Sequence, residues 1–73
     1  MAQSIAIDDE YITLGQLLKL TGAIDTGGQV KFFLSEYEIK VNGVSEARRG
    51  KKLYAGDQIE IETVGTFVIV SES

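Results

Sequence analysis

The sequence predicts an α+β fold in which two helices pack on one face of a small, mainly antiparallel sheet. Two segments, beginning at Thr13 and Thr26, carry a helix-capping pattern followed by apolar residues at helical spacing. Segments 38–41 and 58–62 instead alternate apolar and polar residues, as strands with one buried face do. Because the 73 residues contain no linker or repeat, we expect a single domain, 1–73.

The N-terminal residues predict a short strand followed by an exposed turn. Ile5 and Ile7 alternate with small residues over 4–7, which indicates an edge strand. The acidic triplet 8–10 comes next. We interpret it as a solvated turn rather than a magnesium site, because adjacent carboxylates without distant ligands rarely hold a metal.

The first helix is expected to begin at Thr13 and to stop near Gly22. Thr13 and Gln16 form a T-x-x-Q capping box, and Ile12 and Leu17 stand where a hydrophobic staple would lie. Glycine is the residue that most often follows the end of a helix. The leucines of this segment share one face, which we expect to be buried.

The second helix is expected to begin at Thr26, where Thr26 and Gln29 repeat the capping pattern. Its apolar stripe falls at i, i+3, i+4 and i+7 and consists of Val30, Phe33, Leu34 and Tyr37. Phe32 lies about 200° around the helix from Val30, outside the stripe. We expect Phe32 to pack against the first helix or the N-terminal strand; the alternative is contact with a nucleobase or a protein partner.

The C-terminal half predicts at least three strands joined by turns. Asn42-Gly43 tolerates the positive φ angles of a tight turn, and 55–57 offers a second reversal of the chain. Between these turns, Leu53 and Tyr54 are expected to return to the core. The β-rich segment 66–70 is expected to close the sheet, and 71–73 to fray.

The composition excludes most familiar enzyme sites. The sequence has no cysteine and no histidine, so disulfides, thiolate metal sites and the commonest general base are absent. We therefore expect a protein that is not an enzyme, with no cofactor, no metal site and no small-molecule substrate. No apolar run approaches the roughly 18 residues of a membrane span, and the first ten residues do not resemble a secretory signal. We expect a soluble, cytoplasmic protein without a membrane partner.

Positive charge is segregated along the chain. The net charge is −4, yet all seven basic residues lie between positions 19 and 52, where four acidic residues leave that segment at +3. Four of the seven, Arg48, Arg49, Lys51 and Lys52, form one loop, for which a solvated loop is the simplest interpretation. Lys31 on the second helix and Lys40 on the polar side of its strand are expected to converge with that loop. A face built in this way can follow a phosphate backbone.

The segment TGAIDTGG contains the G-x-x-x-x-G spacing of a phosphate loop at Gly22 and Gly27. Gly28 and Gln29 replace the lysine and the Ser/Thr that such a loop requires, which excludes nucleotide hydrolysis of that type. Two interpretations of Thr26, Gly27, Gly28 and Gln29 stay open. They cap the second helix, or they also hold one phosphate at its N-terminus.

From Thr13 to Glu62 the chain resembles the alpha-L RNA-binding domain, also called the S-four domain. The resemblance is carried by TLGQLLKL, then TGGQVKFFLSEYEIKVNG, and then KLYAGDQIEIE. It implies two helices on a small sheet, no catalysis, and contact with structured, ribosomal RNA through the second helix and the nearby strand and loop. By position it implies RNA contacts from Lys31, Lys40 and the loop 48–52. Thr26-Gly27 stands where many members have Ser-Arg, which shifts the expected contacts toward the loop and Lys31.

Three functions follow from these observations. The leading one is a non-catalytic RNA-binding module that recognises structured, ribosomal RNA. A sulfur carrier of the β-grasp class is the first alternative, because VNG followed by GDQIEI also occurs there, although the chain lacks the C-terminal Gly-Gly that such carriers need. The second alternative is a protein-interaction module anchored by Phe32, whose binding would be insensitive to salt.

Overall fold

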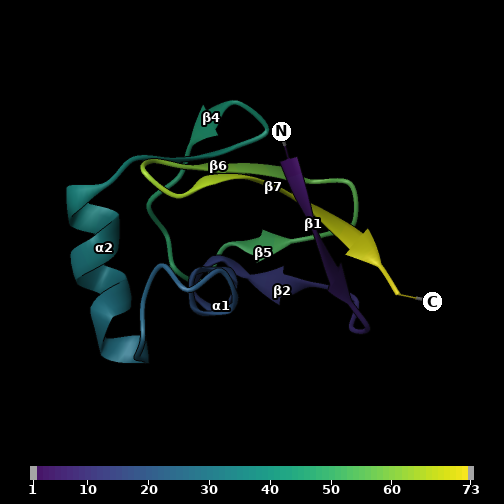
Figure 1. The fold of residues 1–73 in the computed structure, drawn as a ribbon, viewed down its shortest axis with the longest axis horizontal. Helices are drawn as coiled ribbons and strands as arrows, with labels where there is room; N and C mark the ends of the chain where they lie inside the picture. The colour runs from purple at the N-terminus through teal and green to yellow at the C-terminus, as the bar shows by residue number, and fades with distance from the viewer. Residues whose placement is uncertain (1, 73) are drawn as a thin grey trace.

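In the computed structural model, which describes residues 2–72, a five-stranded sheet forms one layer. Its strands, in spatial order, are β1 (Ala2–Ile7), β7 (Gly65–Ser71), β6 (Gln58–Ile61), β3 (Ile39–Val41) and β4 (Val44–Ser45). The other layer holds α1 (Leu14–Leu20), α2 (Val30–Glu36) and a small second sheet of β2 (Ile12–Thr13) and β5 (Lys52–Leu53). Figure 1 shows α2 at one end of the molecule, with α1 and the β2–β5 pair lying below the main sheet. The predicted α+β fold is confirmed.

Strand pairing in the main sheet is antiparallel except at one edge. β3 pairs antiparallel with β4 and β6, and β6 pairs antiparallel with β7, whereas β1 pairs parallel with β7. The predicted N-terminal edge strand is therefore present. The segment 66–70 does not close the sheet, because β7 lies between β1 and β6 and the edges are β1 and β4. Of the C-terminal residues expected to fray, Ser71 ends β7, the Glu72 N–H donates to the Ile7 carbonyl at 2.9 Å, and Ser73 lies outside the described residues.

The first helix is capped as its sequence predicts. The Thr13 N–H donates to Gln16 Oε1 at 2.9 Å, and the Gln16 N–H donates to Thr13 Oγ1 at 3.3 Å. Gly22, just beyond the helix, adopts a φ of 81°, which favours glycine. Within residues 2–72, no helix is long and apolar enough to cross a membrane.

The second helix begins later than predicted. Gly27–Gln29 form a single 3-10 turn, η1, and the α-helix starts at Val30. Gln29 Oε1 accepts hydrogen bonds from the N–H groups of Asp25 and Thr26, at 2.6 and 3.2 Å. Of the predicted stripe, Val30 and Phe33 are buried and Leu34 is half-buried. Tyr37, beyond the helix end, is 36% exposed and packs on the Phe33 ring at 4.6 Å between centroids.

The two turns of the C-terminal half are joined through side chains. Asn42 and Gly43 adopt φ angles of 54° and 84° in the β3–β4 hairpin, and Gly56 adopts 97° in the turn before β6. Asn42 Nδ2 donates to Asp57 Oδ1 at 3.1 Å, and Asn42 Oδ1 accepts from the Gln58 N–H at 3.0 Å. The V-N-G and G-D segments noted in the sequence therefore contact each other directly.

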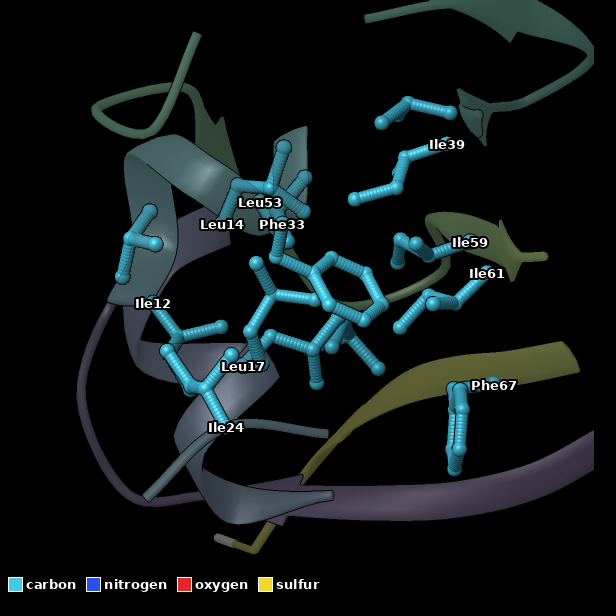
Figure 2. Close-up of a cluster of buried hydrophobic side chains, with 14 of the residues drawn as sticks. Ile12, Leu14, Leu17, Ile24, Phe33, Ile39, Leu53, Ile59, Ile61 and Phe67 are labelled. Carbon is cyan, nitrogen blue, oxygen red and sulfur yellow. The ribbon is translucent and has the colours of Figure 1, made fainter. Parts of the chain in front are cut away.

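The core lies between the sheet and the helices. Figure 2 shows Ile39, Ile59, Ile61 and Phe67 on the sheet side and Ile12, Leu14, Leu17 and Ile24 on the helix side, with Phe33 between them. The alternating strand residues are buried as predicted, because successive side chains of a strand point to opposite faces.

The same alternation corrects one prediction about the core. Leu53 is fully buried, but Tyr54, the next residue, is 43% exposed and does not return to the core. The packing predicted for Phe32 is also wrong, since its side chain is 66% exposed on α2.

Candidate nucleic-acid interface

The basic loop, residues 48–52, is held in place by the first turn of α1. The Gly15 N–H donates to the Arg49 carbonyl and the Leu14 N–H donates to the Lys51 carbonyl, both at 2.9 Å. The first N–H groups of a helix have no partner within the helix, and here the loop supplies two of the missing acceptors. A Cβ atom at Gly15 would lie 3.4 Å from the Arg49 carbonyl oxygen, in ordinary van der Waals contact, so the loop packs directly against this turn of α1. The loop backbone is fixed while Arg48, Arg49 and Lys52 are exposed.

Two hollows flank the basic loop, and we call them the basic hollows. The first, of about 610 Å³, is lined by Lys31, Leu34 and Ser35 of α2 and by Ala47 and Arg49. The second, of about 540 Å³, is lined by Arg48, Gly50, Lys51, Lys52 and Tyr54. Among these lining residues, all in the described part of the chain, none is acidic. The predicted convergence of Lys31 with the loop is therefore present.

Arg48 is the one cation of the loop whose charge is met by a carboxylate among the described residues. Arg48 Nε donates to Glu46 Oε2 at 3.0 Å, Arg48 Nη2 donates to Glu46 Oε1 at 3.3 Å, and the Arg48 N–H donates to Glu46 Oε2 at 3.1 Å. The side-chain hydrogen bonds from Arg48 are the main reason that the pKa of the Glu46 carboxyl falls to about 2. The same bonds raise the pKa of Arg48 above its ordinary value. Part of the Arg48 charge is therefore neutralised within the protein.

Lys40 does not join the other cations. Its neighbours Ile39 and Val41 are buried beneath the sheet, so the Lys40 side chain projects from the opposite face. There it pairs in register with Glu60 and lines a hollow with Glu38, Glu60 and Glu62. The expected convergence of Lys40 with the basic loop is wrong, because the strand directs Lys40 to an acidic surface.

The segment 26–29 caps the second helix. Thr26, Gly27, Gly28 and Gln29 are all exposed, and the Gln29 carboxamide oxygen is already occupied by two backbone N–H groups. A Cβ atom at Gly27 would meet nothing within 4 Å, so packing does not require glycine there. These contacts support the capping interpretation, and phosphate binding by the segment stays a prediction.

Two aromatic residues at this surface were not predicted as site residues. The Tyr11 and Tyr54 ring centroids lie 5.9 Å apart with planes tilted by 54°, and Lys52 Nζ lies 4.9 Å from the centroid of Tyr11. The β2–β5 pairing, Ile12 with Leu53 and Thr13 with Lys52, brings these distant segments together. Strands of two residues show no periodic pattern, so the sequence does not indicate that Tyr11 and Tyr54 meet. The one signal that Tyr54 is exposed is its position next to Leu53, whose side chain points to the opposite face of the strand.

The sequence profile of the S4 domain, the family called S-four above, matches residues 5–70. A protein of Bacillus subtilis (strain 168), "Probable ribosome maturation protein RlbA", is 55% identical over 71 residues, which cover 97% of this chain and 100% of that protein. "Putative RNA-binding protein YbcJ" of Escherichia coli (strain K12) is 37% identical over 49 residues, covering 67% of this chain and 70% of that protein.

Proposed function

The chain belongs to the S4 domain family, and on this premise we propose that it is a non-catalytic module that binds structured, ribosomal RNA. The names of its relatives support two parts of the proposal, namely that the ligand is RNA and that this RNA is ribosomal. YbcJ is named for RNA binding and RlbA for ribosome maturation. The proposed site of action is the cytoplasm, where ribosomal RNA is used.

The observation that carries this proposal is the pair of basic hollows on a chain with a net charge of −4. Lys31 and Arg49 supply positive charge to the first hollow, and Lys51 and Lys52 supply it to the second. Lysine binds phosphate as a point charge, whereas the arginine fork can donate two hydrogen bonds to one phosphate. The proposed interface therefore runs from α2 across the basic loop to β5.

The attachment of the loop to α1 favours recognition of RNA by shape. A loop whose backbone is already fixed loses less conformational entropy on binding than a free loop does. Structured RNA presents phosphates and 2′-hydroxyls in a defined arrangement. Proteins recognise an RNA helix mainly by these groups, because side chains cannot read its deep, narrow major groove. A small rigid surface with cations at fixed positions suits such a ligand. Lys40 lies outside the proposed interface.

The dependence of affinity on salt tests this proposal. The Arg49→Ala/Lys51→Ala variant should reduce the magnitude of the slope of log K against log salt by about 1.4 for single-stranded RNA, at roughly 0.7 per lost phosphate contact, and by about 1.8 for base-paired RNA if each contact counts roughly 0.9 as in duplex DNA. Affinity for ribosomal RNA transcripts would be measured by fluorescence anisotropy from about 50 to 200 mM KCl. Lys40→Ala is the control for position, since it removes a positive charge from the acidic face instead of the loop and should leave the slope unchanged. An unchanged slope in the double variant would contradict the proposal.

A second candidate function is supported by the exposure of Phe32. An apolar ring that is 66% exposed on a helix can anchor a protein partner. Binding of that kind would be abolished by Phe32→Ala and would change little with salt. If binding to purified ribosomal subunits shows that behaviour, while binding to free RNA is absent, the protein-interaction function replaces the RNA-binding function.

A further inference from the structure

We propose that Tyr54, supported by Tyr11, stacks on an unpaired nucleobase of the RNA whose backbone the basic loop holds. This inference rests on the proposed function and adds to it a preferred kind of ligand, a structured RNA with an unpaired nucleotide beside the helix. Tyr54 lines the second basic hollow together with Lys51 and Lys52, and its side chain is 43% exposed. A tyrosine ring and cations in one hollow match the base and the phosphates of a nucleotide.

The ring of Tyr54 is held ready for such a contact. Its N–H donates to Asp57 Oδ2 at 2.8 Å, and its carbonyl accepts from the Asp57 N–H at 3.0 Å, so the backbone is fixed on both sides. The preceding residue, Leu53, is fully buried and anchors the strand. Tyr11 packs against the Tyr54 ring at 5.9 Å, and Lys52 Nζ lies near the Tyr11 ring. A ring restrained in this way loses little rotational freedom when a base stacks on it.

Comparison with Tyr37 shows why exposure alone does not make a tyrosine a candidate for stacking. Tyr37 is 36% exposed, close to the 43% of Tyr54, but it lines a hollow that also contains Glu36, Glu38 and Glu62. Carboxylates at that position repel the phosphates that accompany every base. Of these two tyrosines, only Tyr54 lies where a nucleotide could stack its base on the ring and bring its phosphate near a lysine.

The ligand must offer an unpaired base, because bases inside a duplex are already stacked on their neighbours. Stacking on an aromatic side chain is tolerant of sequence, since every base has a π-face. Phosphate contacts fix the register of the RNA, whereas the stacked base selects for an unpaired position. The inference therefore predicts a preference for the junction between a helix and a single strand, without a strict preference among the four bases.

Two RNA probes test the inference. The first is a blunt hairpin whose loop is replaced by a non-nucleotide linker, so that it has no unpaired base, and the second is the same hairpin with a short unpaired 3′ extension that carries 2-aminopurine. The Tyr54→Ala variant should bind the extended hairpin about 10-fold more weakly, because one base stack is lost, and should bind the blunt hairpin as the unaltered protein does. The salt slope should not change, since no phosphate contact is removed. Quenching of 2-aminopurine fluorescence by the unaltered protein should disappear in Tyr54→Ala.

Control variants separate stacking from loss of folding. Tyr54→Phe keeps the ring and should retain affinity and quenching, whereas Tyr54→Leu keeps apolar bulk without a ring and should lose quenching. Tyr37→Ala is matched in exposure and should behave as the unaltered protein does. The thermal unfolding midpoint of each variant, compared with that of the unaltered protein, tests whether the fold is kept.

The failures of the two proposals are distinguishable. Equal losses on the blunt and extended hairpins, or quenching that persists in Tyr54→Ala, would overturn the stacking inference. The proposed function would still stand if Arg49→Ala/Lys51→Ala lowered the salt slope. If the unaltered protein bound neither hairpin nor ribosomal RNA in a salt-dependent manner, both proposals would fail.

Discussion

Single residues decide how much charge the basic loop can offer to a ligand. Arg48 and Arg49 are adjacent, yet Arg48 is engaged by Glu46 at 3.0 Å while Arg49 lines an open hollow with Lys31. An ion pair whose arginine is 76% exposed adds little stability, because solvent screens the guanidinium charge. Its larger effect is on binding, since a guanidinium that already holds a carboxylate must exchange it before it can hold a phosphate.

Replacing Glu46 should therefore strengthen RNA binding. Glu46→Gln removes the negative charge and frees Arg48 to neutralise a phosphate, so the salt slope should become steeper by up to about 0.7 and affinity should rise at low salt. Anisotropy titrations over a range of KCl concentrations measure both quantities. Glu72→Gln changes the net charge by the same amount at an exposed position away from the loop and should have little effect. Equal gains from both variants would mean that only net charge matters.

The elements that could be predicted are those with a local signal. The capping box at Thr13 and Gln16 is a contact between residues three apart, so its sequence pattern is sufficient to predict it. The β2–β5 pair could not be predicted, because two-residue strands carry no periodicity and their partners are distant in the chain. The parallel pairing of β1 with β7 could not be predicted either, because the two strands are far apart in the sequence and no local pattern indicates which strands pair.

The site was predictable to a similar extent. Lys31 and the basic loop come together, as the sequence predicts. Lys40 was placed on the polar side of its strand correctly, but the sequence did not indicate that this side is the outer, acidic face of the sheet. The orientation of a sheet face relative to a distant loop depends on tertiary packing, which no local pattern encodes.

The hydrogen bonds of Asn42 should be essential to the joining of the two turns. Asn42→Ala loses both side-chain bonds, to Asp57 and from the Gln58 N–H, and places alanine at a φ of 54°. We expect a loss of about 2 to 3 kcal/mol in the free energy of unfolding. Asn42→Gly loses the same bonds without the backbone strain and should cost about 1 kcal/mol less. Urea denaturation measures the difference, and equal losses would show that φ contributes nothing.

On the scale of the whole molecule, charge is divided between two surfaces. The basic hollows lie around the loop 48–52, whereas the outer face of the sheet carries Glu38, Glu60 and Glu62 around Lys40. A protein with separated charges of this kind is oriented by the field of a polyanion as it approaches. We therefore expect the acidic face to disfavour the binding of phosphates on that side of the molecule.

Neutralising part of the acidic face should weaken this discrimination. Glu38→Gln/Glu60→Gln leaves the basic hollows unaltered but removes two negative charges near Lys40. The variant should elute from a heparin column at higher salt, while its affinity for ribosomal RNA, relative to that for heparin, falls. If the ratio of the two affinities did not change, the acidic face would have no part in selectivity.

The parallel pairing of β1 with β7 has a consequence for how the chain acquires its structure. Each residue of β1 pairs with a residue of β7 that lies 64 positions later in the sequence, from Ala2 with Thr66 to Ile7 with Ser71. Contacts between segments so far apart raise the contact order and slow folding, because a long loop must close before they form. During translation this edge of the sheet therefore cannot form until β7 has left the ribosome, and until then the backbone N–H and C=O groups of β1 that pair with β7 lack those partners.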